Sequence, residues 1–164
     1  FTADDPPQSL VAKLEKDFLK TGGDLQSLAQ TLVRAPESWA AEPVKFRQPI
    51  EWLTSVLRFT GVDGLSERRM TGALRQLGQV PWGAPSPAGF DDQADSWAGP
   101  DALLRRVELA ERIARNAPSD AVLARAEAAF PGALTDNTRA WLSRAESNTQ
   151  ALGLMLVAPE MLRR

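Results

Sequence analysis

The chain has 164 residues, 43% of them hydrophobic, and a formal net charge of −2, so we expect one helical domain over residues 1–164. It contains no cysteine, histidine or tyrosine. These absences exclude cysteine and histidine zinc sites, thiol chemistry and His-based catalytic triads. The nearly balanced charge disfavours a general electrostatic contact with nucleic acid, so no nucleic-acid partner is expected.

Apolar residues spaced three and four apart predict helices at the N-terminal end. Asp5 is the expected N-cap of the first helix, Gly22 and Gly23 its stop, and Asp24 the N-cap of the second. We expect two apolar stripes to face inward, namely Leu10, Val11, Leu14 and Phe18 on the first helix and Leu25, Leu28, Leu32 and Val33 on the second.

The same spacing continues through the middle of the chain. A third helix is predicted from about Pro49 to Gly61, and a fourth from a cap at Ser66 to Gly78. The tryptophans that lie within or at the ends of helical patterns are expected in the core, and these are Trp39, Trp52 and Trp141.

The C-terminal part is also helical in pattern. Pro100 opens a fifth predicted helix, Ser119 caps a sixth that runs to Phe130, and Thr135 caps a seventh. The longest apolar stretch, Ala151 to Pro159, is too short to cross a bilayer. No segment alternates long enough to be a strand, so the fold class is all-α, an irregular orthogonal bundle of about seven or eight helices.

Residues 79–99, QVPWGAPSPAGFDDQADSWAG, form a long Pro/Gly-rich segment between the helical patterns. Such loops are uncommon in compact domains and mark either a functional surface or disorder. Trp82, Phe90 and Trp97 are candidate binding residues, because together they offer an aromatic platform for a sugar, polymer or peptide. Alternatively they plug the loop onto the helices. We expect the segment to be ordered, with Trp82 and Trp97 partly buried.

Asp91-Asp92-Gln93-Ala94-Asp95 has the Asp-Asp-x-x-Asp spacing that holds magnesium against a diphosphate in helical isoprenoid synthases. That motif projects from a long helix, whereas this copy follows Pro85, Pro87 and Gly89. A solvated acidic loop is therefore the better interpretation, and we expect neither a metal nor another cofactor.

Several stretches resemble the C-terminal part of the bacterial domain-of-unknown-function family numbered eighteen hundred. They are FTADDPPQSLVAKLEKDF, TGGDLQSLAQTLVRAPESW, KFRQPIEWLTSVLRFTG, LGQVPWGAPSPAGF and DSWAGPDALLRRVELAERIAR. The resemblance covers essentially the whole chain, and the segment from Leu77 to Phe90 is its most specific element.

The resemblance implies a larger protein, often with an export signal, whose His- and acid-rich motifs lie in an N-terminal part. No catalytic residue is carried over to this chain. The opening FTADDPP also reads as the middle of a longer protein. The expected partner is that N-terminal part, with a homodimer as a further alternative, and the expected location is periplasmic or secreted.

These observations name no reaction. We expect a non-catalytic structural or interaction domain of a larger exported bacterial protein. One alternative is the supporting half of a hydrolase-like enzyme whose catalytic residues lie in the N-terminal part. The other is a polymer- or sugar-binding module that uses the loop between Trp82 and Trp97.

Overall fold

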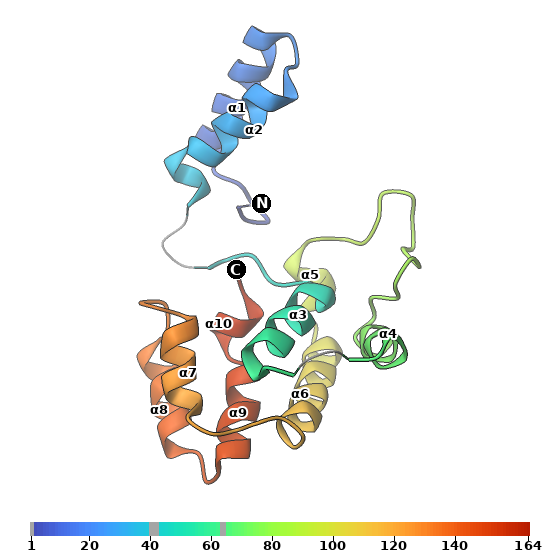
Figure 1. Cartoon of the computed structure of the whole chain (residues 1–164). Coiled ribbons are helices and arrows are strands. Elements are labelled where there is room, and N and C mark those ends of the chain that lie inside the picture. The colour runs from blue at the N-terminus through green and yellow to red at the C-terminus, as the bar shows by residue number, and fades with distance from the viewer. Residues whose placement is uncertain (1, 40–42, 63–64) are drawn as a thin grey trace. The chain divides into compact units, whose positions relative to one another are not determined.

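The computed structural model describes residues 2–39, 43–62 and 65–164. Within these ranges it contains ten α-helices and a short 3-10 helix, with eight of the α-helices at least seven residues long and no strands (Figure 1). Its one isolated antiparallel bridge joins Phe46 to Arg163. The all-α prediction is confirmed. Among the described residues, no helix combines the length and apolar character needed to cross a membrane.

The chain separates into two compact units, residues 1–45 and 46–164. Each has its own internal packing, described separately below. The expectation that residues 1–164 act as one domain stays a prediction.

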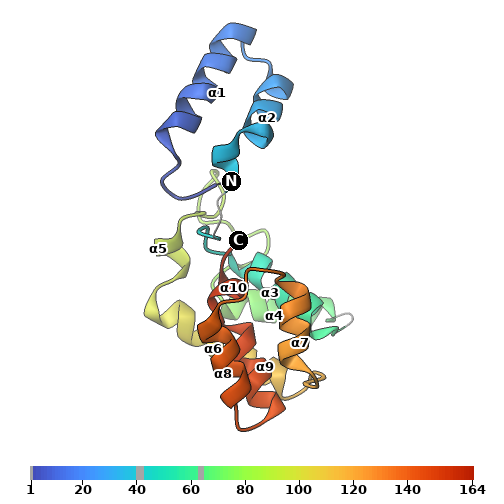
Figure 2. The ribbon, with the colours of Figure 1, turned by 90° about the vertical axis from the view of Figure 1, so that its left-hand side faces the viewer.

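Residues 1–45 contain a helical hairpin of α1 (Gln8–Thr21) and α2 (Leu25–Arg34), followed by the 3-10 helix η1 (Pro36–Ser38) (Figure 2). The predicted cap at Asp24 is confirmed, since its side chain accepts a hydrogen bond from the Gln26 backbone N–H at 2.9 Å. The predicted cap at Asp5 is wrong. Pro6 precedes another proline, which disfavours helical backbone there, so the helix begins only after Pro7.

The hairpin buries little of its apolar surface. Of the two predicted stripes only Leu10 is fully buried, while Val11, Phe18, Leu25 and Val33 are 40%, 45%, 71% and 51% exposed. The inward placement of these four side chains is therefore wrong. Two helices can shield only the surfaces that they turn toward each other, and the short η1, which contacts both of them, is too small to cover the rest.

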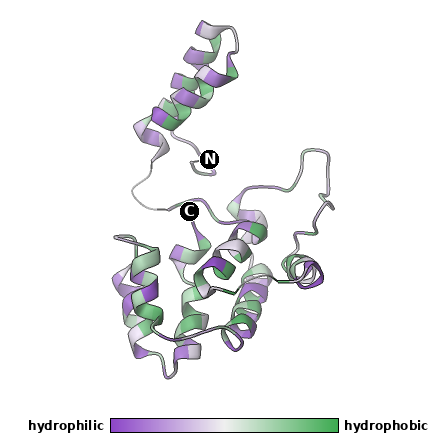
Figure 3. Ribbon diagram, viewed as in Figure 1, coloured by the Kyte–Doolittle hydropathy of each residue, from purple (hydrophilic) through white to green (hydrophobic). Residues whose placement is uncertain are grey.

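Residues 46–164 pack around a central helix, α9 (Asn148–Leu156), which contacts α6, α7, α8 and α10. Leu152, Met155 and Leu156 of α9 are completely buried. Trp52 of α3 (Pro49–Thr60) is also completely buried, and its indole N–H donates to the Leu156 carbonyl at 2.9 Å. The hydropathy colouring shows apolar and polar residues mixed along these helices (Figure 3).

The other helices of this unit are α4 (Glu67–Gln76), α5 (Ala94–Trp97), α6 (Pro100–Ala114), α7 (Val122–Ala129), α8 (Asp136–Arg144) and α10 (Pro159–Leu162). Pro100 opens α6 and Thr135 caps α8, as predicted. The predicted cap at Ser119 is wrong, because Ala121 has a left-handed φ of 47° and helical backbone begins only at Val122.

The tryptophans predicted to lie in the core divide. The prediction is confirmed for Trp52, which is buried. It is wrong for Trp39 and Trp141, which are 63% and 51% exposed. Trp39 lies at the end of η1 in the thinly packed hairpin unit, and Trp141 lies on the outer surface of α8. An apolar helical pattern therefore did not by itself identify a core position.

Candidate functional site

The Pro/Gly-rich loop between α4 and α5 is fastened at its first end to the start of α3. The Gln79 side chain is buried, and its Oε1 accepts a hydrogen bond from the Ile50 N–H at 2.8 Å. Its Nε2 donates to Gln48 Oε1 at 3.0 Å, and Gln48 Nε2 donates in turn to the Asp91 carbonyl at 3.2 Å. One pair of glutamines thus connects both ends of the loop to the same helix terminus.

The second end of the loop is fastened by Asp91 and Trp97. The Asp91 carboxylate accepts hydrogen bonds from the Gln93 N–H at 3.1 Å and the Ser96 hydroxyl at 2.7 Å. The Trp97 indole N–H donates to the Asp91 carbonyl at 2.7 Å, and its ring packs at a tilt on Phe90 with centroids 6.2 Å apart. Trp97 is only 7% exposed, so its predicted burial is confirmed.

The stretch between these ends, residues 82–88, is exposed at every position. Two tight turns shape it, closed by Gly83 N–H donating to the Val80 carbonyl and Gly89 N–H donating to the Ser86 carbonyl, each at 3.0 Å. Prolines at positions 81, 85 and 87 fix the backbone φ at three places. The loop is therefore a stiff projection and not a slack connection.

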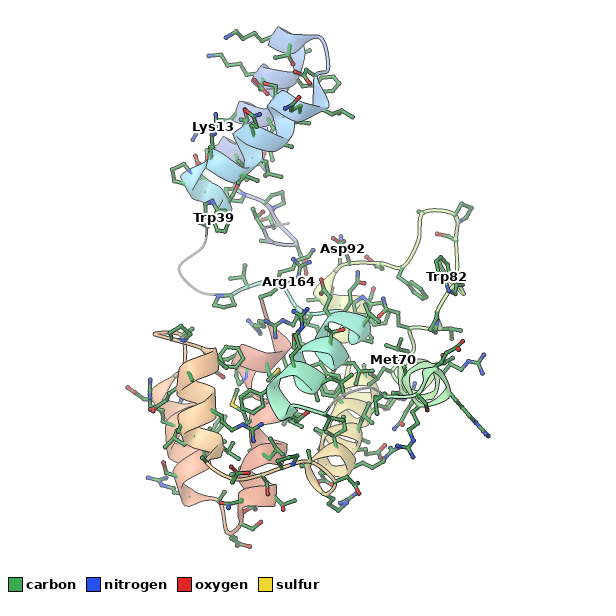
Figure 4. All side chains as sticks on the ribbon, in the orientation of Figure 1. Lys13, Trp39, Met70, Trp82, Asp92 and Arg164 are labelled. Carbon is green, nitrogen blue, oxygen red and sulfur yellow. The ribbon has the colours of Figure 1, made fainter. Side chains whose placement is uncertain are left out.

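Trp82 occupies the third position of the first turn, and a positive φ at this position, as in a type II turn, usually belongs to glycine or asparagine. Its φ is 60°, and its side chain is fully exposed (Figure 4). Left-handed backbone costs a residue with a large side chain about 1–2 kcal/mol, and no buried surface offsets that cost here. The prediction that Trp82 is partly buried is wrong, because the turn places the indole outside the packed helices.

The structure brings together only two of the three predicted aromatic residues. Phe90 and Trp97 line a pocket of about 480 Å³, with Asp101 and Arg105 among its polar lining residues. Trp82 does not line this pocket. The single aromatic platform that the sequence suggested is thus divided into a packed pair and a separate exposed indole.

The acidic cluster in the loop serves the local fold. Asp91 uses both carboxylate oxygens to support the start of α5, while Asp92 and Asp95 are exposed. Within the described part of the chain, no group of three or more acidic side chains is arranged to hold a metal ion. The contacts of Asp91 thus account for part of this cluster through the local fold.

Sequence reasoning missed the residues that hold the loop in place. Gln48 and Gln79 lie 31 positions apart, and neither belongs to a recognisable motif. The one local signal was the polar residue directly before Pro49, which also makes a capping box with Glu51 at the start of α3.

This architecture defines an all-α protein that carries a stiff loop with an exposed tryptophan. Residues 1–163 match the model of a family described as a protein of unknown function (DUF1800). Since the match spans nearly the whole chain, the protein belongs to this family, which confirms the resemblance seen in the sequence. Searches of curated proteins and of solved structures gave no match.

Proposed function

We propose that the chain is a non-catalytic interaction domain of a larger exported bacterial protein and that Trp82 is its principal contact residue. The observation that supports this function is the combination of left-handed backbone and full exposure at Trp82. Strained positions persist where the surrounding structure or a function maintains them. Here the strain leaves a large aromatic ring in solvent, which benefits a partner and not the fold.

The loop suits binding in two further respects. Tryptophan is enriched among the residues that dominate binding energy, because one ring buries a large area with few rotatable bonds. The three prolines and the glutamine clamp hold the backbone in place before any partner arrives. Ordering such a loop on binding therefore costs little conformational entropy.

The first partner that we propose is the N-terminal part of the same full-length protein. The test is iodide quenching of tryptophan fluorescence in the 164-residue chain and in the full-length protein. The difference between wild type and Trp82→Phe isolates the contribution of Trp82, and Trp141→Phe is the matched control for an exposed indole on a helix. We expect Trp82 to be quenched in the chain and shielded in the full-length protein.

Equal quenching of Trp82 in both proteins would contradict an internal partner. If the full-length protein is a dimer that dissociates on Trp82→Ala, the partner of Trp82 is a second copy of the protein and not its own N-terminal part.

A polymer- or sugar-binding role is the second candidate, and the pocket beside Phe90 and Trp97 favours it. Asp101 and Arg105 offer a hydrogen-bond acceptor and donors next to these aromatic side chains, a combination that can recognise hydroxyl groups. Co-sedimentation with insoluble cellulose, chitin and peptidoglycan separates the two roles. Retention that is lost in Arg105→Ala and kept in Trp82→Ala would favour a polymer bound in this pocket.

Export is the remaining part of the proposal, and it rests on the family resemblance. A fusion of the full-length gene to a phosphatase that is active only outside the cytoplasm tests it. Phosphatase activity is expected, and its absence from a stably expressed fusion would contradict a periplasmic or secreted location.

A further inference from the structure

A groove of about 700 Å³ lies among α3, α4 and α6, apart from the tryptophan loop. Its apolar lining includes Leu53 and Leu109, which are buried in the core, together with Leu57 and Ile113. Small-molecule sites commonly have volumes of about 300–1,000 Å³ and predominantly apolar walls, and many lie between the helices of bundles. The groove has the size and composition of such a site.

Gly72 lines this groove from the middle of α4. A glycine inside a helix costs about 1 kcal/mol relative to alanine. Nothing in the packing requires the glycine, because its φ is not positive and an added Cβ would meet no atom within 4 Å. A longer side chain at this position would instead occupy the groove. The missing side chain thus keeps the groove open at a cost to helix stability.

In the described part of the chain, the charged side chains that line the groove are basic. Its described lining residues include Arg69 and Arg112 but no carboxylate. Arg112 is held in place, since its Nη2 donates to Gln76 Oε1 at 3.1 Å. Arg69 is exposed and makes no hydrogen bond or ion pair with any described residue. An apolar floor beside two cations is complementary to a molecule with an apolar body and an anionic head.

We propose that this groove binds a long-chain carboxylate of the fatty-acid class. Its hydrocarbon chain would lie on the partly exposed side chains of Leu57, Leu65 and Ile113. Its carboxylate would be paired by Arg69, with Arg112 beside it. The inference goes beyond the interaction role proposed for Trp82 and does not depend on it.

Calorimetric titration of the 164-residue chain with dodecanoate, kept below its micelle concentration, tests the site. Dodecylammonium has the same chain with the opposite charge and serves as the ligand control. We expect saturable one-to-one binding of dodecanoate and at least tenfold weaker binding of dodecylammonium. Equal binding of the two amphiphiles, or no binding of dodecanoate, would overturn the proposal.

Two pairs of variants locate the binding. Arg69→Gln should weaken dodecanoate binding about fivefold, whereas Arg68→Gln, the neighbouring arginine outside the groove, should leave it unchanged. Gly72→Leu should abolish binding by filling the groove, and Gly72→Ala should retain most of it. Both Gly72 variants should unfold at a temperature no lower than that of the wild type, since each improves helix propensity.

The result that would overturn the site is dodecanoate binding that survives Gly72→Leu unchanged. If a peptide helix and not a small molecule occupies the groove, the chain should bind an acidic amphipathic peptide and ignore dodecanoate.

Discussion

The guanidinium of Arg106 lies over the ring of Phe46, 4.6 Å from its centroid, and 5.5 Å from the centroid of a Trp52 ring. Arg106 is 1% exposed, and its Nη2 donates to the Arg47 carbonyl at 2.7 Å while its Nη1 is buried without a hydrogen-bond partner. Burial lowers the pKa of this arginine to about 10. Arg106 thereby connects the first residues of the 46–164 unit to α6, at the cost of a buried cation.

Arg106→Met should leave the protein as stable as the wild type or more stable, by up to about 3 kcal/mol, because it fills similar space without a desolvated charge. Arg106→Ala should be less stable than Arg106→Met by about 2–5 kcal/mol, because it leaves a cavity. Urea unfolding of the three proteins at pH 8 measures both differences. A large loss of stability in Arg106→Met would show that the contacts of the cation outweigh its desolvation.

The stability of Arg106→Met relative to the wild type should decrease as the pH rises above about 10. Since the folded-state pKa of Arg106 lies below its ordinary value of 12.5, the unfolded chain holds this proton more tightly than the native protein. Raising the pH between these two values therefore stabilises the wild type but not the variant. Urea unfolding at pH 8 and pH 10.5 measures the change, and a constant difference between the proteins would contradict it.

Trp97→Ala should lower the free energy of unfolding by about 3–5 kcal/mol, because its buried ring anchors the loop. Trp82→Gly should instead raise it by about 1 kcal/mol, since glycine adopts positive φ without a steric penalty and no buried surface is lost. Chemical unfolding of the two variants provides the comparison. Destabilisation by Trp82→Gly would mean that the indole contributes to the fold.

Gln79→Leu should lower the free energy of unfolding by about 1–3 kcal/mol, because the variant leaves the partly buried Ile50 N–H without its acceptor. It should also release the first end of the loop and speed proteolytic cleavage within residues 82–88. Gln93→Leu, which alters an exposed glutamine at the other end of the loop, is the control. Limited proteolysis followed by mass spectrometry identifies the cleavage sites, and equal cleavage of both variants would argue against the clamp.

Glu160 should stabilise the protein in a pH-dependent manner. Burial alone would raise the pKa of its carboxyl, but hydrogen bonds from the Thr135 N–H at 2.8 Å and the Thr138 hydroxyl at 3.0 Å outweigh that effect and lower it. A lowered folded-state pKa gives stability that is present above the unfolded value and lost as the pH falls through the folded value.

Glu160→Gln should therefore lower the free energy of unfolding by about 1–3 kcal/mol at pH 7. The difference in the free energy of unfolding between the variant and the wild type should become smaller below about pH 4, where the carboxyl of the unfolded chain begins to take up its proton. Thermal unfolding between pH 3 and pH 7 measures it, with Glu146→Gln as an exposed control. A difference that stays constant over this range would contradict the role of the charge.

Local sequence determined the longer helices and most of their ends. Prolines at 49 and 100 and the hydroxyl cap at Thr135 act within one helical turn, so neighbouring residues alone specify them. The same is true of the family, because a contiguous match over residues 1–163 requires no knowledge of contacts. A misplaced helix start has a different cause. The left-handed φ of Ala121 delays the helix after Ser119, and an alanine gives no sequence signal for such a φ.

Only the tertiary structure decided which apolar side chains are buried. Trp52 and Trp82 have the same hydrophobicity, yet one lies in the core and the other lies in solvent. The groove with Gly72 and the Gln48–Gln79 clamp also depend on residues far apart in the chain. Periodicity indicates that a face is apolar, but burial requires a second surface to cover it. That surface exists around α9 and is incomplete around the α1–α2 hairpin.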